Sequence, residues 1–412
     1  MYWYRIILII LATFTISNAK LPKSEDSLII EALVYEEYQS YENSYLVYNE
    51  LFKIHKDKAY LIKKAKSALM AKKHILFMIK QLKKWQKTHK KDSIEIKRVL
   101  IPLYLTIDNS KKAIKESKRL LKLSNKPLDL LLSSNAYLYV GNFKMTLKLL
   151  KQIYNQKQTE VILFRITSLM ENFTNQRKEA ITFLESHYRM YDSSKDLYIK
   201  LLILYQKDKN INGILSTYKA LYYKFGKDEY LDKLISTYIY KQDFDKAIKL
   251  LEKENKKLSI LYELYKNEKL FKKAINLLDK IYKRDKNPKW LSEKAILIFE
   301  SSKNQNDKKM ITKVIELFQN AVKLGNDDSI YLNYYGYTLI DKNLDIKNGI
   351  KIVKKALSQQ PNNAYYLDSL AWGYYKQRDC VNAYKVMKQV VAKEGLKEKE
   401  IIHHWRAIKQ CK

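Results

Sequence analysis

The feature of this sequence that most constrains its fold is a position that recurs at long intervals within an apolar pattern and is most often occupied by a small residue. We call it the marker position. Between Ala113 and Ala247 it recurs in steps of 33, 34, 34 and 33 residues. Isolated amphipathic helices have no such long-range period, whereas stacked helical repeats do. Elsewhere the steps vary, and two of them, 27 and 40 residues, together span about two repeats. The markers fall at or near Ser44, Ile75, Ala113, Thr146, Ala180, Ile214, Ala247, Ala274, Val314, Gly349 and Ala383.

Around each marker the sequence indicates two helices joined by a short polar turn. In the segment from Tyr240 to Ala247, for example, polar turn residues precede Phe244, which starts the second helix. The chain has only 8 glycines and 5 prolines in 412 residues, so few positions interrupt helices. An aromatic residue recurs near the end of the first helices. We expect it to fill the gap between paired helices rather than to bind a cofactor. The residues at this position are Tyr104, Tyr137, Tyr205, Tyr238, Tyr265 and Tyr374.

The pattern is clearest between residues 326 and 395. It contains Asn-Tyr-Tyr-Gly-Tyr at 333–337, Pro361, and Tyr-Leu-Asp-Ser-Leu-Ala-Trp-Gly-Tyr-Tyr at 366–375. These small, aromatic and proline positions resemble those of the tetratricopeptide repeat, a helix–turn–helix unit of about 34 residues. The resemblance implies an all-α, right-handed α-solenoid of about eleven helical hairpins. We therefore predict one superhelix over residues 20–412, with regular repeats at 92–285, the best-matching repeats at 326–395 and a capping helix at 396–412.

The first 19 residues resemble an export signal. Arg5 supplies a positive start, Ile6 to Ile16 is an apolar run too short to span a bilayer, and Ser17-Asn18-Ala19 offers a cleavage site before Lys20. A buried N-terminal helix is the alternative. No cysteine follows the apolar run, so a lipid anchor at that point is not expected. We expect the mature chain to be exported, most simply to the periplasm of a bacterium.

The net charge of +34 comes mostly from lysine, because only nine of the 78 basic residues are arginine. Arginine is favoured where phosphate is recognised, and an exported protein seldom meets nucleic acid. We therefore do not expect a nucleic-acid partner. The simplest interpretation is a set of solvated lysine faces. A positive surface that contacts an anionic envelope polymer or a membrane surface is the alternative.

The C-terminal segment is expected to cap the array, since the last repeat needs a helix with one polar face. Its apolar stripe consists of Ile401, Ile402, Trp405 and Ile408. The two cysteines of the chain, Cys380 and Cys411, lie at similar distances from a turn at Gly395. In an antiparallel helix pair they would lie side by side, and an oxidising compartment would join them in a disulfide. Two free buried thiols are the alternative.

No catalytic or cofactor motif stands out. The sequence has no phosphate-binding loop, His-Glu-x-x-His motif, nucleophile elbow or paired cysteine ligands. His403 and His404 are adjacent, and adjacent residues on a helix point about 100° apart, so they are not expected to share a metal. The repeats also leave no room for a compact catalytic domain. We expect no enzymatic activity, no cofactor and no metal.

In the tetratricopeptide family the first helices line a concave groove, and peptide ligands lie along it. Matching motif positions in the two best repeats indicate the groove-facing residues Asn333, Tyr334, Tyr337, Asp368, Ser369, Trp372, Tyr375 and Lys376. Aromatic and amide side chains can stack and hydrogen-bond at low entropy cost. Packing between repeats is the alternative for Tyr337 and Trp372. Corresponding positions elsewhere are often apolar, as at Leu131, Leu132, Ile199 and Ile203. Such residues indicate internal packing or an apolar helical ligand.

Together these features predict a non-catalytic scaffold or adaptor that binds a protein partner through its groove. The Asn-Tyr-x-Gly-Tyr and Tyr-Leu-Asp-Ser-Leu-x-Trp patterns are similar to those of some bacterial envelope repeat proteins. That similarity implies a part of an envelope assembly, for motility or secretion, or an adaptor for a periplasmic protease. An electrostatic binder of anionic envelope polymer is the alternative, and its binding would collapse as the salt concentration rises.

Overall fold

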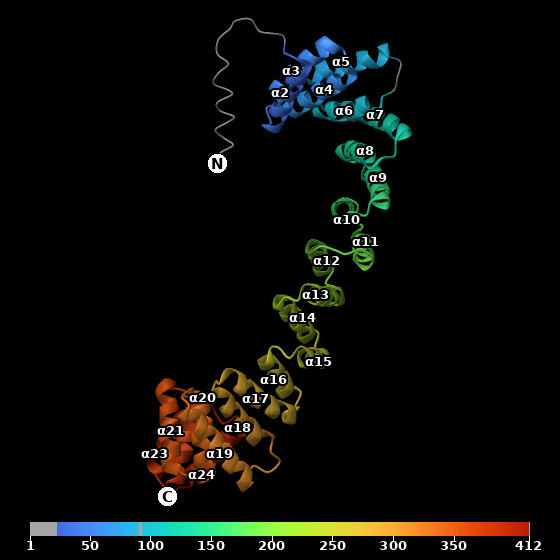
Figure 1. Cartoon of the computed structure of the whole chain (residues 1–412). Coiled ribbons are helices and arrows are strands. Elements are labelled where there is room, and N and C mark those ends of the chain that lie inside the picture. Colours follow the sequence, from blue (N-terminus) through green and yellow to red (C-terminus); the bar gives the residue numbers. More distant parts are fainter. Residues whose placement is uncertain (1–22, 90–92, 412) are drawn as a thin grey trace, which may run out of the picture. The chain divides into compact units, whose positions relative to one another are not determined.

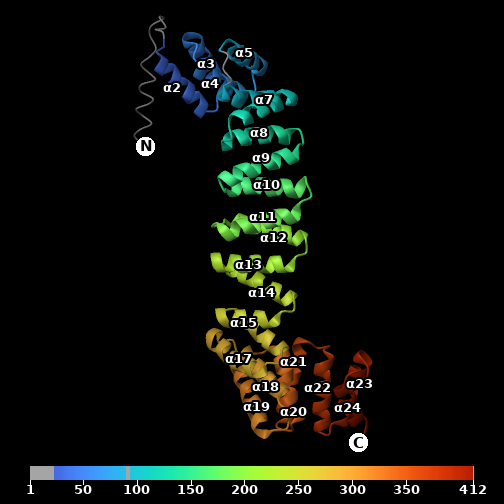
Figure 2. The same ribbon diagram turned by 90° about the vertical axis from the view of Figure 1, so that its right-hand side faces the viewer.

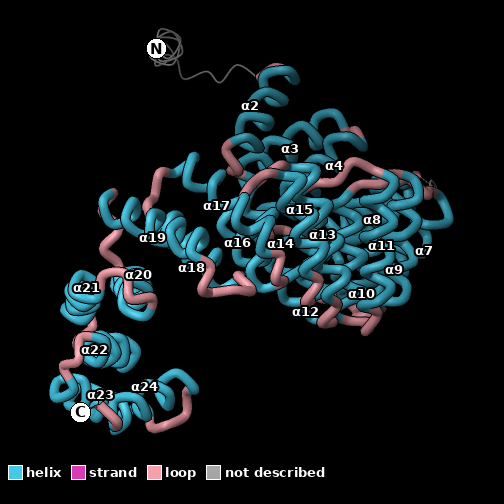
Figure 3. The backbone as a smooth tube through the Cα atoms, turned by 90° about the horizontal axis from the view of Figure 1, so that it is seen from below, coloured by secondary structure: helices cyan, strands magenta, loops and turns pink. Residues whose placement is uncertain are grey.

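The computed structural model describes residues 23–89 and 93–411, and the expected export signal at 1–19 lies outside them. In these residues all regular secondary structure is helical, in 23 helices from α2 to α24 (Figures 1 and 3). None of the described helices combines the length and the apolarity needed to cross a membrane. The helices form eleven successive hairpins, α2–α3 to α22–α23, and α24 follows alone. The predicted all-α array of about eleven hairpins with a capping helix is confirmed.

The chain divides into two compact units, which we call unit 1 (Met1–Tyr230) and unit 2 (Leu231–Lys412). Helix α14 (Asp228–Tyr240) contains the division. The continuity of the array as one superhelix over residues 20–412 stays a prediction. The other helices of unit 1 are α2 (Glu25–Glu37), α3 (Tyr41–His55), α4 (Lys58–Ala71), α5 (Ile75–Thr88), α6 (Ile94–Thr106), α7 (Ser110–Leu123), α8 (Pro127–Tyr139), α9 (Phe143–Gln156), α10 (Glu160–Asn172), α11 (Arg177–Met190), α12 (Lys195–Lys207) and α13 (Ile211–Phe225).

The hairpin α8–α9 illustrates how the sequence builds unit 1. Gly141 takes the left-handed turn conformation with φ of 71°, and the side chain of Asn142 accepts a hydrogen bond from the Met145 backbone N–H, which caps α9. Leu147, Leu150 and Ile153 then follow at helical spacing and are buried. Helices α8 to α13 follow one another in a stack, in which each contacts the next (Figure 2). Buried residues of α8 to α12 form one apolar core between them.

Unit 2 continues the same design and ends with the cap. Its helices after α14 are α15 (Phe244–Glu254), α16 (Leu258–Asn267), α17 (Phe271–Asp285), α18 (Lys289–Ser301), α19 (Lys308–Lys323), α20 (Ser329–Asp341), α21 (Ile346–Gln359), α22 (Ala364–Lys376), α23 (Cys380–Glu394) and α24 (Lys399–Lys409). Helix α24 contacts both α22 and α23 (Figure 3). Its buried residues Ile401 and Ile408 belong to the predicted apolar stripe.

Small residues sit where paired helices approach closely. Ala113, Ala180 and Ala247 are completely buried in their second helices. In α13 the structure corrects the predicted register by one residue. Gly213, and not Ile214, is the buried position, and a Cβ atom on it would lie 2.3 Å from the Tyr205 ring.

In the hairpin α20–α21 a pair of glycines allows the two helix backbones to approach closely. A Cβ atom on Gly336 would lie 2.8 Å from the carbonyl oxygen of Gly349, and a Cβ on Gly349 would lie 2.7 Å from the carbonyl oxygen of Gly336. The absence of side chains at these two glycines therefore allows α20 to pack directly against α21. The position of α20 in turn determines where the side chains on its other face lie.

Candidate functional site

The candidate site lies in unit 2, where the first helices of three successive hairpins are neighbours. Helix α20 contacts α18 on one side and α22 on the other. The side chain of Asp328 caps α20 by accepting from the Ile330 N–H at 2.8 Å. The side chain of Asn363 caps α22 by accepting from the N–H groups of Tyr365 and Tyr366, at 3.1 and 3.4 Å. The caps set where each helix starts and therefore which side chains face the neighbouring helix.

A cavity of about 540 Å³ opens between these helices. It lies within the size range of typical ligand sites, roughly 300–1,000 Å³. Its walls come from α18 and the loop that follows, from α20, from α22 and its cap, and from α24. They consist of Phe299, Glu300, Gln305, Ile330, Asn333, Tyr334, Tyr337, Thr338, Asn363, Tyr365, Tyr366, Asp368, Ser369 and Glu400.

Two tyrosine hydroxyls donate hydrogen bonds to carboxylates at the cavity. The Tyr334 hydroxyl donates to Oε1 of Glu300 at 3.0 Å, and the Tyr337 hydroxyl donates to Oε1 of Glu400. Burial, together with the adjacent Glu300, raises the pKa of Tyr334 to about 12. Burial first, and then the hydrogen bond to Glu400, raises the pKa of Tyr337 far above its usual value. Both hydroxyls therefore remain neutral donors at physiological pH.

Five of the eight residues predicted to face the groove line this cavity. They are Asn333, Tyr334, Tyr337, Asp368 and Ser369. Tyr334 is 37% exposed, and Tyr365, which also lines the cavity, is 58% exposed. The use of these residues by a partner stays a prediction.

The other three predicted residues, Trp372, Tyr375 and Lys376, do not line the cavity. Trp372 is only 5% exposed, and its ring stacks on Tyr375 at a centroid distance of 4.9 Å. Lys376 lies over the Trp372 ring, with Nζ 5.1 Å from the ring centroid. The same Nζ donates to the Asp341 carbonyl oxygen at 3.4 Å. Trp372 therefore packs between helices, which is the alternative that the sequence left open for this residue.

Helix α24 explains why Trp372 is covered. His404, on α24, is buried, and its Nδ1 lies 3.0 and 2.9 Å from the two carboxylate oxygens of Asp368. At the other end of this segment, Cys411 forms a disulfide with Cys380, with Cα atoms 5.5 Å apart. The cap is thus attached to α22 by a polar contact and to α23 by a covalent bond.

Sequence reasoning missed several residues of the cavity wall. Glu300 and Phe299 lie in the last turn of α18, the first helix of the preceding hairpin, so extending the repeat match by one repeat could have found them. Gln305 comes from the longer loop after α18, and Glu400 comes from the cap. Neither segment has an equivalent in the repeat pattern, so no signal in the sequence points to them.

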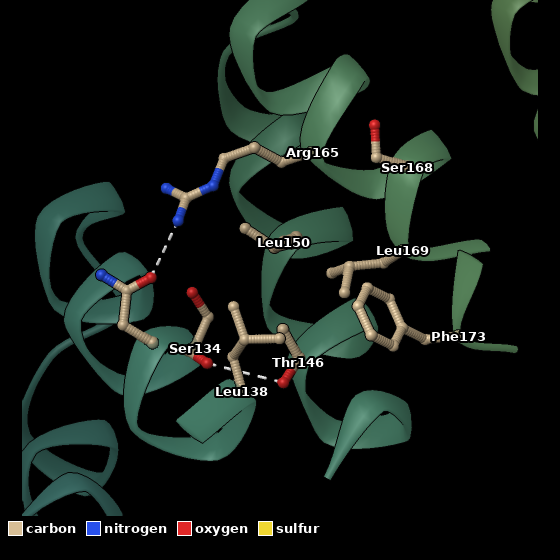
Figure 4. A pocket seen from close by; sticks show the side chains of 9 residues that line it. Ser134, Leu138, Thr146, Leu150, Arg165, Ser168, Leu169 and Phe173 are labelled. Atoms are coloured by element: carbon tan, nitrogen blue, oxygen red, sulfur yellow. Dashed lines mark hydrogen bonds between the residues drawn. The ribbon is translucent and has the colours of Figure 1, made fainter. Parts of the chain in front are cut away.

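Unit 1 contains a smaller cavity, of about 190 Å³, between α8, α9 and α10 (Figure 4). Arg165 reaches across from α10, and its Nη2 donates to Oδ1 of Asn135 at 2.9 Å. On the opposite wall the Thr146 hydroxyl donates to the Asn142 carbonyl oxygen at 2.9 Å and lies 3.5 Å from the Ser134 carbonyl oxygen. Leu138, Leu150, Leu169 and Phe173 complete the lining with apolar surface. This cavity is a gap between consecutive hairpins and contains none of the predicted site residues.

Across the described ranges, no group of three or more histidine, cysteine, aspartate or glutamate residues is arranged to hold a metal ion. The adjacent histidines play different roles. His404 contacts Asp368 as described, and the His403 ring lies 5.6 Å from the Trp372 ring. The two side chains therefore belong to the packing between α22 and α24.

The hairpin array and its cavity define the class of the protein as an all-α, tetratricopeptide-like solenoid. No family model and no curated protein matches the sequence. Among solved structures, the chain is similar to a chain of the structure of Naa15/Naa10 bound to HypK-THB, with 14% identity over 92% of this chain and 64% of that chain, and a TM-score of 0.35.

Two further solved structures are similar to this chain. For the APC/C hetero-tetramer Cut9-Hcn1 the identity is 11%, over 94% of this chain and 96% of that chain, with a TM-score of 0.36. For the MamA protein the identity is 16%, over 48% of this chain and 91% of that chain, with a TM-score of 0.30. With such low TM-scores, none of these likenesses bears on the partner or the function of this chain.

Proposed function

We propose that this protein is a non-catalytic interaction scaffold that binds a protein partner through the cavity between α18, α20 and α22. The observation that carries the proposal is the cavity itself, in which exposed aromatic rings and fixed polar groups converge. Tyrosine rings supply large contact areas at low entropy cost, and they are common in the centres of protein interfaces. The first helices that build the cavity are those expected to line the groove of a repeat array.

The experiment is a comparison of partners captured from the source cells. Cells that produce the tagged full chain are crosslinked, and the captured proteins are compared with those from a Tyr334→Ala, Tyr365→Ala variant. Tyr240→Ala is the matched control, because Tyr240 is 75% exposed and lies outside the cavity. The proposal expects one or a few proteins to be lost with the cavity variant and kept with the control. Capture of the same proteins by all three chains would disprove it.

We also propose that the protein acts outside the cytoplasm, in the periplasm of a bacterium, within an envelope assembly or as an adaptor for a protease. Residues 1–19 support this proposal through their charge, apolar run and small cleavage-site residues. N-terminal sequencing of the protein from the periplasmic fraction should give Lys20 as the first residue. A chain recovered in the cytoplasm with Met1 at its start would contradict the proposal.

A second candidate function, binding of anionic envelope polymer, is favoured by one feature of unit 1. Helix α7 presents Lys111, Lys115, Lys118 and Lys122, which line a depression of about 320 Å³ together with Ile114 and Arg119. These lysines follow the spacing of one helix face. Binding through them should fall steeply as the salt concentration rises. Replacing the four lysines with glutamine should abolish polymer binding and leave the cavity partner bound.

A further inference from the structure

The cavity between α18, α20 and α22 is acidic, although the protein is strongly basic. The chain contains 78 lysine and arginine residues against 44 aspartate and glutamate residues. The cavity reverses this balance, because Glu300, Asp368 and Glu400 line it and none of its lining residues is lysine or arginine. Among the described residues, Glu300 and Glu400 have no ion pair with a basic side chain. Asp368 contacts His404, whereas Glu300 and Glu400 are exposed, so these two carboxylates are accessible to a positively charged ligand.

Acceptor oxygens without a donor are found among the residues that line the cavity. Oδ1 of Asn333 is buried and receives no hydrogen bond from the described residues. Glu300 and Glu400 each use Oε1 to accept from a tyrosine, which leaves Oε2 of each carboxylate for another donor. An unpaired buried amide oxygen is uncommon and calls for a donor. The free Oε2 atoms and the negative charge of the two glutamates favour a ligand that is both a hydrogen-bond donor and a cation.

Aromatic rings complete this environment. The rings of Tyr334 and Tyr365 are the most exposed on the cavity wall. Glu300 and Glu400 accept hydrogen bonds from Tyr334 and Tyr337, which are three residues apart on one face of α20, so the two carboxylates lie beside neighbouring side chains of that face. A cation placed between them would contact a ring face and two carboxylates together. Such combined contacts favour arginine and lysine side chains.

We propose that this cavity binds a cationic side chain of a peptide partner, with arginine favoured over lysine. The planar guanidinium carries five N–H donors and can serve the Glu300 and Glu400 carboxylates while it stacks on a tyrosine ring. A lysine ammonium carries three donors and does not stack. The inference rests on the proposed function, because the peptide belongs to the protein partner, and it adds the chemistry by which the partner is recognised.

The test uses the full chain and three small probes in saturation-transfer NMR titrations. The probes are N-acetyl-arginine methylamide, N-acetyl-lysine methylamide and N-acetyl-citrulline methylamide, the last being a neutral analogue of arginine. Because charge-assisted hydrogen bonds are about twice as strong as neutral ones, the arginine probe should bind about ten-fold more tightly than the citrulline probe. The lysine probe should bind with an intermediate Kd.

The variant Glu300→Gln with Glu400→Gln should abolish this preference. The amide oxygens still accept from Tyr334 and Tyr337, so the cavity keeps its shape while it loses two charges. Glu316→Gln is the matched control, because Glu316 is exposed in unit 2 and lies outside this cavity. Unchanged thermal unfolding of the double variant would show that it is folded.

The inference is overturned if the arginine probe does not bind, if it binds no better than the citrulline probe, or if the double variant keeps the preference. Its failure is distinguishable from failure of the proposed function. If capture of a partner depends on Tyr334 and Tyr365 but the arginine probe does not bind, only the inference of a cationic ligand is overturned. Arginine binding together with capture that is insensitive to these tyrosines would overturn only the scaffold role.

Discussion

The ring of His404 lies on the ring of Trp372, with centroids 4.1 Å apart and planes inclined by 19°. His404 belongs to α24 and Trp372 to α22, so this stack joins the cap to the last hairpin. Nδ1 of the same histidine contacts Asp368, one turn before Trp372 on α22. A surface that the repeat pattern leaves open to a partner is therefore covered by the chain itself.

We expect Trp372→Ala to destabilise unit 2 and to release α24. Removing a buried tryptophan costs about 3–5 kcal/mol through lost burial and the cavity that it leaves. Trp372→Phe keeps an aromatic ring against His404 and should lose less. Hydrogen exchange of peptides from α24, measured for both variants, checks this expectation. Unchanged protection of α24 in Trp372→Ala would show that the stack does not hold the cap.

The disulfide between Cys380 and Cys411 should stabilise the same contact. It closes a loop with a sequence separation of 31 residues, and in the chain-entropy model such a loop contributes on the order of 3–4 kcal/mol. A reductant should therefore lower the melting temperature of the full chain. The variant with Cys380→Ser and Cys411→Ser should melt at the lower temperature and should not respond to the reductant. Equal melting temperatures of the oxidised and reduced proteins would count against a stabilising bridge.

The contact between Gly336 and Gly349 leads to a prediction for the hairpin α20–α21. In Gly336→Ala the new methyl group would meet the Gly349 carbonyl oxygen at 2.8 Å, and a backbone atom cannot rotate away. The two helices would have to separate, at a cost of about 2–3 kcal/mol. Gly141→Ala is the control, because it has a φ of 71° but no atom within 4 Å, and it should lose only about 1 kcal/mol through backbone strain. Thermal unfolding of both variants gives the comparison.

The fold could be predicted from the sequence because its determinants are local and repeated. A small residue such as Ala113 or Ala180 is required wherever two helices cross closely, so the repeat length appears directly as a spacing. The one-residue correction at Gly213 has a similar origin. The size of the Tyr205 ring, which the spacing does not record, decides which residue of α13 must be small.

The candidate site could be predicted only where it follows the repeat pattern. Asn333 and Asp368 occupy equivalent faces of α20 and α22, and the structure brings both to the cavity. Trp372 could not be placed correctly because its neighbour, His404, lies in the cap, which has no counterpart in the repeats. Glu400 was missed for the same reason. Contacts between segments distant in sequence need the folded structure.

Lys64 in unit 1 is the basis of a prediction about pH. Its side chain is completely buried in α4, and Nζ donates to Oε1 of Gln81 at 2.9 Å. The surrounding groups are aromatic, with Nζ 5.3 Å from the Tyr45 centroid, 5.7 Å from Phe52 and 5.0 Å from Phe77. Burial, and to a smaller degree the charge of Lys53, lowers the pKa of Lys64 from 10.5 to about 8. Compared with the unfolded chain, the folded protein therefore releases the Lys64 proton at a lower pH.

Lys64→Met should stabilise the protein at pH 7, by on the order of 1–3 kcal/mol. Below about pH 8 both the folded and the unfolded states hold the Lys64 proton, so the full cost of burying the charge is present. Between about pH 8 and 10.5 the folded state releases the proton while the unfolded state still binds it, so the cost declines and the advantage of methionine should fade. Thermal unfolding of the full chain at pH 7 and pH 10 measures the difference, with the exposed Lys66→Met as the control. An advantage that is equal at the two pH values would mean that methionine acts through packing and not through the buried charge.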